Sequence, residues 1–198
     1  MIEVRAGLAG PSRTGGILAA SLEKMRARRL PPQYKVDILK IISGGQTGVD
    51  RAALDVALKH RIKCGGWCPA GRLDESGKIP DRYPLKELKH GGNEERTLRN
   101  VHDSDGTVVI YFHELEGGTG YTVGCCIEDR QPYRLIDAAR YSPEDAATLM
   151  VSFVYDHDVE TLNLAGPRES EWVGGYAYAF RTVDVFVSRL RASWRRRV

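Results

Sequence analysis

The sequence predicts an α/β domain with a mostly parallel sheet that helices cover on both faces. Short apolar, β-branched segments alternate with amphipathic segments between residues 36 and 192, and strands that alternate with helices in this way form parallel sheets. Two of the strand segments also run directly into glycine-rich stretches, around 44–48 and 117–122. The 198 residues are enough for one compact domain with extra length at an end.

The first unit of the domain is a strand, a glycine turn and a helix. Residues 38–43 form a short β-branched run, residues 44–48 read Gly-Gly-Gln-Thr-Gly, and small apolar residues recur at helical spacing from 49 to 57. This order is typical of the start of a βαβ unit. A second short strand is expected near 62–67. Residues 68–92, rich in Pro, Gly and charge, are expected to form a long functional loop.

The second half of the domain contributes three more strands and a closing helix. The strands are predicted at 107–112, 133–136 and 161–165. Ser142 and Pro143 predict a helix start, because serine caps a first turn and proline fits within it. The closing helix is expected over 174–191. Right-handed crossovers place the segments that leave parallel strands at one edge of the sheet.

The two ends of the chain differ in charge from the domain between them. Residues 1–35 are predicted to be an N-terminal extension with a short helix near 17–29, and residues 193–198 a basic tail. Residues 41–188 hold 23 Asp and Glu against 16 Lys and Arg, whereas the ends hold 3 against 13. Such an acidic body is a poor surface for nucleic acid. The basic arms are expected to be solvated or to dock on the acidic domain, and contact with RNA or an anionic surface is the alternative.

The sequence is typical of a cytoplasmic protein without a membrane partner. No apolar run approaches the ~20 residues of a membrane-spanning helix, and the N-terminus lacks the pattern of a secretory signal. The four cysteines do not have the C-x2-C spacing of a structural zinc site, and we expect small buried thiols. A metal site built from all four is the alternative. They are Cys64, Cys68, Cys125 and Cys126.

The segments that leave the strands form the expected ligand site, because ligands bind outside the carboxyl ends of the strands in an open parallel sheet. The glycines around 44–48 and 117–122 would let backbone N–H groups approach an anion, and the helix that follows would add its positive end. Thr47 and Thr122 could donate hydroxyls to the same phosphate. The first segment matches neither G-x-G-x-x-G nor the P-loop pattern. A tight strand-to-helix connection is therefore the alternative for either segment taken alone.

Four ordered motifs resemble one protein family. They are I-I-S-G-G-Q-T-G-V-D at 41–50, G-G-W-C-P-A-G at 65–71, D-S-D-G-T-V at 103–108 and L-N-L-A-G-P-R at 162–168. Together they resemble the putative molybdenum carrier family, a branch of the Rossmann-like SLOG superfamily that includes the lysine-decarboxylase-like (LOG) nucleotide-processing proteins. The resemblance implies a three-layer α/β/α Rossmann-like fold and homo-oligomers, either dimers or tetramers. It also implies binding of molybdenum cofactor (molybdopterin), whose pterin carries a phosphate.

The resemblance assigns the two glycine-rich segments as phosphate loops. The first consists of Gly44, Gly45, Gln46, Thr47 and Gly48, and the second of Gly117, Gly118, Thr119, Gly120 and Thr122. Hydrolytic LOG relatives carry P-G-G-x-G-T-x-x-E, in which the Glu helps to cleave a glycosidic bond. Here Glu116, Tyr121 and Gly124 stand at the Pro, Thr and Glu positions. Glu128 lies one turn further on and could substitute only in a shifted helix, so the motif counts against an enzyme.

Six further residues are candidate ligand contacts: Arg51, Arg99, Asp103, Ser104, Asp105 and Arg168. Arg168 follows the last predicted strand, and its guanidinium matches phosphate oxygens as a fork. Arg51 and Arg99 are expected to reach the anion, with a plain helix-surface position as the alternative for Arg99. Asp103 and Asp105 would bind Mg²⁺ or a ribose-like hydroxyl, or simply form the turn before the next strand.

Three functional hypotheses follow from the sequence. The first is a binding or carrier protein for a phosphate-bearing heterocycle, either molybdenum cofactor or a nucleotide. The second is a LOG-type nucleotide phosphoribohydrolase. The third is a nucleotide sensor that signals through its basic arms. No serine or histidine stands in a nucleophile–base pattern, so no catalytic residue is assigned, and no motif firmly implies a metal ion.

Overall fold

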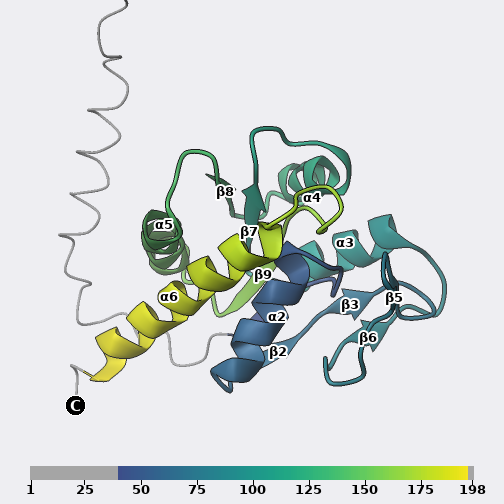
Figure 1. The fold of residues 1–198 in the computed structure, drawn as a ribbon, viewed down its shortest axis with the longest axis horizontal. Helices are drawn as coiled ribbons and strands as arrows, with labels where there is room; N and C mark the ends of the chain where they lie inside the picture. Colours follow the sequence, from purple (N-terminus) through teal and green to yellow (C-terminus); the bar gives the residue numbers. More distant parts are fainter. Residues whose placement is uncertain (1–39, 196–198) are drawn as a thin grey trace, which may run out of the picture.

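A five-stranded parallel sheet lies between two layers of helices in the computed structural model, which describes residues 40–195 (Figure 1). The strands are β1 (Lys40–Ile42), β2 (Lys63–Gly65), β7 (Gly106–Tyr111), β8 (Tyr133–Asp137) and β9 (Thr161–Ala165). Their order across the sheet is β2-β1-β9-β7-β8, and all neighbours are parallel. This architecture confirms the predicted three-layer α/β/α fold.

Five helices within residues 40–195 cover the sheet. They are α2 (Val49–Lys59), α3 (Asn93–His102), α4 (Gly117–Glu128), α5 (Pro143–Asp156) and α6 (Gly175–Arg195). Helix α6 packs against α2 and α5 on one face, and α3 packs against α4 on the other. The start of α5 is as predicted, because Ser142 caps it by accepting from the Asp145 N–H at 3.2 Å. None of the helices in the described part of the chain is long and apolar enough to cross a membrane.

The structure describes part of the predicted C-terminal tail but none of the predicted N-terminal extension. The predicted extension over 1–35, with its short helix near 17–29, lies outside the described residues, as do residues 196–198. Residues 193–195, predicted to begin the basic tail, instead continue the backbone of α6.

The last strand in the sequence occupies the centre of the sheet. β9 pairs with β1 on one side and β7 on the other, so that Leu162 lies opposite Ile41 and Leu164 opposite Val108. These four side chains are fully buried in the main core, together with side chains of α2, α5 and α6. Because β1, β9 and β7 are adjacent and parallel, their carboxyl ends lie side by side.

The cysteines are free thiols that belong to separate clusters. Cys125 and Cys126 pack with Val101 between α3 and α4, while Cys68 packs in a different cluster beside α2. These three are buried, and Cys64 is partly buried. Burial raises the pKa of Cys126 and keeps its thiol neutral. The expectation of small buried thiols is confirmed for these three.

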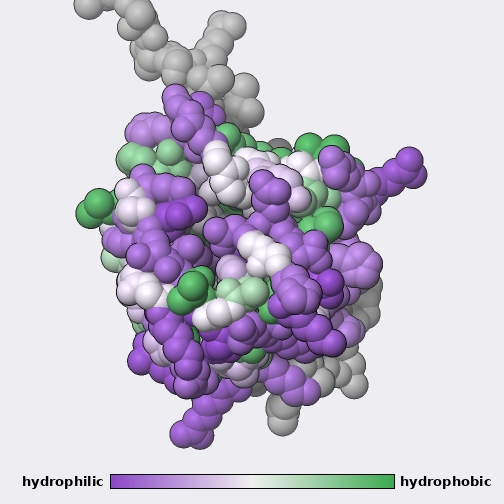
Figure 2. Space-filling view, turned by 90° about the vertical axis from the view of Figure 1, so that its right-hand side faces the viewer, coloured by the Kyte–Doolittle hydropathy of each residue, from purple (hydrophilic) through white to green (hydrophobic). Residues whose placement is uncertain are grey.

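The segment predicted as a long loop contains four two-residue strands. β3 (Trp67–Cys68) pairs in parallel with β6 (Lys86–Glu87), and β4 (Leu73–Asp74) forms a hairpin with β5 (Gly77–Lys78). A small core against α2 holds them, made of Leu54, Cys68, Ile79, Tyr83 and Leu85. Strands this short show no periodicity in sequence, which is why the prediction missed them. Figure 2 shows that the outer surface on this side is mostly hydrophilic, with hydrophobic residues scattered across it.

Candidate ligand-binding site

The segments after β1, β9 and β7 meet at the carboxyl edge of the sheet. The Val49 N–H donates to the Pro167 carbonyl at 3.2 Å, which ties the start of α2 to the segment after β9. A Cβ added at Gly166 would lie 2.4 Å from the Ile110 carbonyl oxygen of β7. These close approaches bring three distant parts of the sequence together, as the topology predicts.

The first glycine-rich segment is a tightly packed turn. Gly45 and Gly48 have φ of +76° and +70°, a region that favours glycine. A Cβ at Gly45 would lie 2.4 Å from Leu85, and one at Gly48 would lie 2.4 Å from the Pro167 carbonyl oxygen. The packing of Leu85 and Pro167 therefore already requires glycine at both positions.

The polar groups of this turn are also paired within the protein. The Gln46 side-chain oxygen accepts from the N–H groups of Thr47 and Glu75, both at 3.0 Å. The Gln46 N–H approaches the Asp50 carboxylate at 3.4 Å. Gln46 therefore fixes the turn and joins it to the β4–β5 hairpin.

A buried ion pair lies beneath the turn. Arg96 Nη1 lies 2.9 Å from Asp50 Oδ2, and the two side chains are only 14% and 3% exposed. The guanidinium rests on Gly44, because a Cβ there would fall 1.5 Å from Arg96 Nη1. Burial raises the pKa of Asp50 above its ordinary value, although Arg96 and the Gln46 N–H act to lower it. Arg96 is one of the residues that sequence reasoning missed at this edge, together with Glu75, Glu171 and the aromatic side chains of Phe112 and Trp172.

A carboxylate from the β4–β5 hairpin occupies the space between the first turn and the segment after β9. Glu75 accepts hydrogen bonds from the hydroxyls of Thr47 and Ser170 and from the Ser170 N–H at 3.2 Å. Arg168 Nε lies 4.0 Å from Glu75 and 3.0 Å from Glu171. Burial acts to raise the pKa of Glu75, but the hydrogen bonds from Ser170 and Thr47 lower it overall. Two predicted anion donors, Thr47 and Arg168, thus already face carboxylates.

The second glycine-rich segment is the open first turn of a helix, where a loop was predicted. Helix α4 begins at Gly117, and the residue before it, Glu116, makes no side-chain cap. A Cβ at Gly117 or Gly118 would meet no atom within 4 Å. Thr122 donates its hydroxyl to the Gly118 carbonyl at 2.9 Å, so it supports the turn from within. The first N–H groups of a helix have no intrahelical partner and lie at its positive end.

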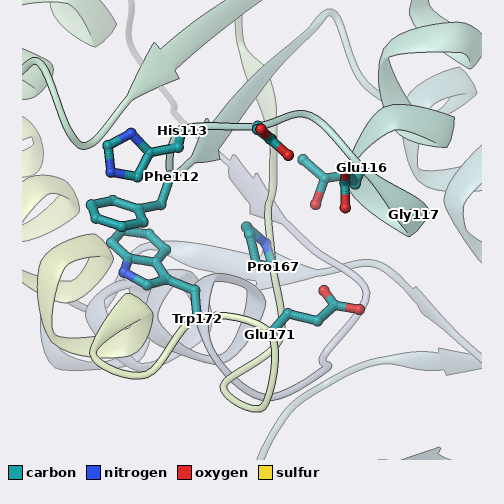
Figure 3. Close-up of a pocket in the computed structure, with 9 residues that line it drawn as sticks. Phe112, His113, Glu116, Gly117, Pro167, Glu171 and Trp172 are labelled. Atoms are coloured by element: carbon teal, nitrogen blue, oxygen red, sulfur yellow. The ribbon is translucent and has the colours of Figure 1, made fainter.

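Two hollows adjoin in front of this turn. The smaller, of about 30 Å³, is lined by Gln46, Asp50, Arg96, Thr97, Gly118, Thr119, Thr122, Ala165, Gly166, Arg168 and Glu171. The larger, of about 350 Å³, is lined by Phe112, His113, Glu114, Glu116, Gly117, Thr119, Pro167, Glu171 and Trp172. Figure 3 shows aromatic rings on one side of the larger hollow and Glu116 and Glu171 on the other. Both hollows are lined by Thr119 and Glu171, so they are neighbours at these two residues.

The comparisons with known proteins agree with these motifs and this architecture. Residues 41–187 match the model of the circularly permutated YpsA SLOG family (cpYpsA). The chain belongs to this family. It is similar to a crystal structure named putative molybdenum carrier protein, from Syntrophus aciditrophicus SB, at 46% identity over 76% of this chain and 95% of that chain, with a TM-score of 0.74. A search of curated proteins found no match.

In this cpYpsA chain, two predicted arginines lie outside both hollows. Arg51 donates to the Gly45 carbonyl at 3.0 Å and to Asp74 at 2.5 Å, so it joins the first turn to the β4–β5 hairpin. Arg99 lies 5.0 Å from the Trp67 ring and 2.8 Å from Glu95. Arg96, one turn earlier on α3, takes the position at the carboxyl edge that was expected for Arg99.

The predicted D-S-D-G turn precedes β7 and is likewise outside both hollows. Asp103 accepts from the Trp67 indole N–H at 2.8 Å, while Asp105 accepts from the Glu160 and Thr161 N–H groups at 3.1 and 2.6 Å. The Ser104 hydroxyl donates to the Val101 carbonyl at 2.7 Å. Asp105 thereby joins the amino ends of β7 and β9, at the edge of the sheet opposite the hollows.

The hollows therefore gather only part of the predicted set. Gln46, Gly117, Gly118, Thr119, Thr122 and Arg168 line one or the other. Gly44, Gly45, Thr47 and Gly48 form the packed turn behind them. Within residues 40–195, no three His, Cys, Asp or Glu side chains are arranged to hold a metal ion.

Proposed function

We propose that this chain is a binding or carrier protein for a phosphate-bearing heterocycle, with molybdenum cofactor the first ligand to test. The observation that carries the proposal is the pair of adjoining hollows at the carboxyl edge. The smaller offers the first turn of α4, Thr119, Arg96 and Arg168 to an anion. The larger offers a flat ring an aromatic wall, formed by Phe112 and Trp172. The name of the Syntrophus protein supports molybdenum as part of the cargo.

The phosphate would lie at the start of α4. There the N–H groups of Gly117 and Gly118 and the helix dipole favour a negative charge. The Thr119 N–H, in contrast, already donates to the Glu116 carbonyl at 3.1 Å. Arg168 stands opposite but is shared between Glu75 and Glu171. Binding would therefore require the phosphate to replace at least one carboxylate beside Arg168. That exchange allows the cargo to be released, which suits a carrier.

Hydrolysis of an N-glycosidic bond, as in LOG proteins, is the second candidate. Position 124 holds glycine, and Glu128 is the last residue of α4, about 16 Å along the axis from its start. Glu128 is therefore too distant to replace the motif carboxylate. Glu171 lines both hollows and is the carboxylate that could take this role.

Native mass spectrometry of the gently purified protein, followed by release and identification of the bound molecule, tests the proposal. A pterin phosphate or molybdenum would support the carrier. A nucleotide, or a base with ribose phosphate, would favour the hydrolase. The same spectrum gives the subunit number and tests the proposed homo-oligomer. A matched pair of variants, Arg168→Ala and Arg140→Ala, checks the location, since Arg140 lies on the surface after β8. Equal retention of ligand by both would contradict it.

A further inference from the structure

The larger hollow has the size and the lining of a ring-binding pocket. Its volume of about 350 Å³ falls in the range of small-molecule sites. Phe112 and Trp172 stack with ring centroids 5.2 Å apart and an interplanar angle of 8°, and Trp172 packs in turn on Tyr178 at 5.5 Å. Phe112 nevertheless remains 42% exposed. The His113 ring packs on Phe112 from the other side, with centroids 4.2 Å apart and an interplanar angle of 65°. The hollow thus has a supported aromatic wall, and a flat heterocycle can pack against the ring edges that remain exposed.

The opposite side of this hollow offers hydrogen-bond acceptors. Three glutamates line it, and neither lysine nor arginine is among its lining residues. Glu171 pairs with Arg168, but the ion pairs within residues 40–195 leave Glu114 and Glu116 without a cationic partner. An ionised carboxylate only accepts hydrogen bonds. These two side chains therefore favour a ligand edge that presents N–H groups.

The segment that carries these acceptors has a defined conformation. The Glu114 N–H donates to the Phe112 carbonyl at 2.8 Å, which closes a tight turn. At its centre, His113 has φ of +64°, and its N–H faces the Asp137 carboxylate at 3.4 Å. Glu116 immediately precedes α4. Phe112, the two acceptors and the start of α4 thus follow one another within residues 112–117.

We infer that the larger hollow selects heterocycles whose edge carries adjacent ring N–H and amino donors, as guanine and pterins do, through Glu114 and Glu116, while the exposed edges of Phe112 and Trp172 pack against the ring. This inference rests on the proposed function and narrows its ligand class. Adenine presents a ring acceptor beside its amino group, so a carboxylate meets a lone pair at one of its two contacts. A well-placed pair of hydrogen bonds to a base edge discriminates by about tenfold or more.

Calorimetric titration of the full chain with GMP, IMP, AMP and inorganic phosphate tests the inference. GMP should bind at least about tenfold more tightly than AMP. IMP, which keeps the ring N–H but lacks the amino group, should fall between them. Glu114→Gln and Glu116→Gln should each reduce the ratio of GMP to AMP affinity. Glu128→Gln, the same change on an exposed residue at the far end of α4, should leave the ratio unchanged. Phe112→Leu should weaken all three nucleotides alike.

The outcomes separate this inference from the proposed function. Equal affinity for the three nucleotides, unaltered in the glutamate variants, would overturn the base selection and leave the phosphate site intact. If the nucleotides bind no more tightly than inorganic phosphate, the base selection would likewise be overturned and the phosphate site would remain. Failure of GMP to bind overturns the inference whatever native mass spectrometry finds, whereas a pterin phosphate found by that method would still support the carrier.

Discussion

The two glycine-rich segments look alike in sequence but differ in what surrounds them. In residues 44–48, the space beside the glycines is filled by the chain itself: Leu85 lies against Gly45, Pro167 against Gly48 and Arg96 against Gly44. In the first turn of α4, the space beside Gly117 and Gly118 is empty. The glycines at 44–48 permit close packing of other parts of the protein against the backbone. The glycines at the start of α4 leave the backbone accessible to a ligand.

This difference changes the interpretation of a glycine-rich motif. Packing alone accounts for the glycines at 44–48, without a ligand. This agrees with the alternative interpretation of that segment, a tight strand-to-helix connection. Its contribution to a site would be indirect, through the buried pair of Arg96 and Asp50 that it covers. The open turn of α4 is where a phosphate could meet backbone N–H groups. Four substitutions test this division, in order of decreasing expected effect.

Arg96→Met should lower the free energy of unfolding most, by about 3–5 kcal/mol, because it leaves the Asp50 carboxylate buried without its partner. Urea denaturation at neutral pH measures the loss. Protonated Asp50 is neutral, so the difference from the wild type should shrink as the pH falls. Adding Asp50→Asn should recover part of the loss. A double variant less stable than the single one would contradict a charge-based cost.

Gly48→Ala should cost about 2–3 kcal/mol, because alanine is strained at φ of +70° and its Cβ would meet the Pro167 carbonyl. The same denaturation experiment gives the value. If this variant were as stable as the wild type, the segment after β9 must be able to move away from residue 48. The turn at 44–48 would then be less tightly packed than its geometry indicates.

Glu75→Gln should cost about 1–2 kcal/mol near neutral pH, since it weakens charge-assisted hydrogen bonds from Thr47 and Ser170. The pKa of Glu75 lies below its ordinary value of 4.5, so its contribution is complete above that pH and is lost as the pH falls through the folded-state pKa. The gap between wild type and variant should therefore narrow in acid. A gap that is constant with pH would show that the charge does not matter.

The same substitution probes the anion site. Glu75→Gln removes one of the two carboxylates beside Arg168, so inorganic phosphate should bind more tightly in calorimetric titration. Glu87→Gln, on β6, is a matched control that should leave phosphate affinity unchanged. Weaker phosphate binding in Glu75→Gln alone would indicate that the carboxylate orients Arg168 and does not compete for it.

Gly118→Ala should change stability least, by at most about 1 kcal/mol and in the stabilising direction, because alanine favours a helix and its Cβ meets nothing within 4 Å. Phosphate affinity should fall, since the methyl group restricts approach to the first turn of α4. The comparison with Gly48→Ala is direct. If both variants lost stability equally, the contrast between the two segments would be wrong.

The sequence predicted the features that depend on local patterns. The alternation of strands and helices indicated the fold, and Ser142 marked the start of α5 correctly. It could not distinguish Arg96 from Arg99, because the two lie one turn apart on α3 and only tertiary packing decides which one faces the sheet edge. Nor could it place Glu75 beside Thr47 and Ser170, since those contacts span 28 and 95 residues. No local rule relates segments so distant.

The position of β9 determines when the two hollows can form during folding. Within residues 40–195, β1 pairs with β2 and β7 pairs with β8, and β9 alone joins these two half-sheets. A nascent chain that has reached residue 160 therefore has both glycine-rich segments and no strand to bring them together. Pairings so distant in sequence also form slowly. The hollows come into existence only when β9 enters the middle of the sheet, after both glycine-rich segments have been made.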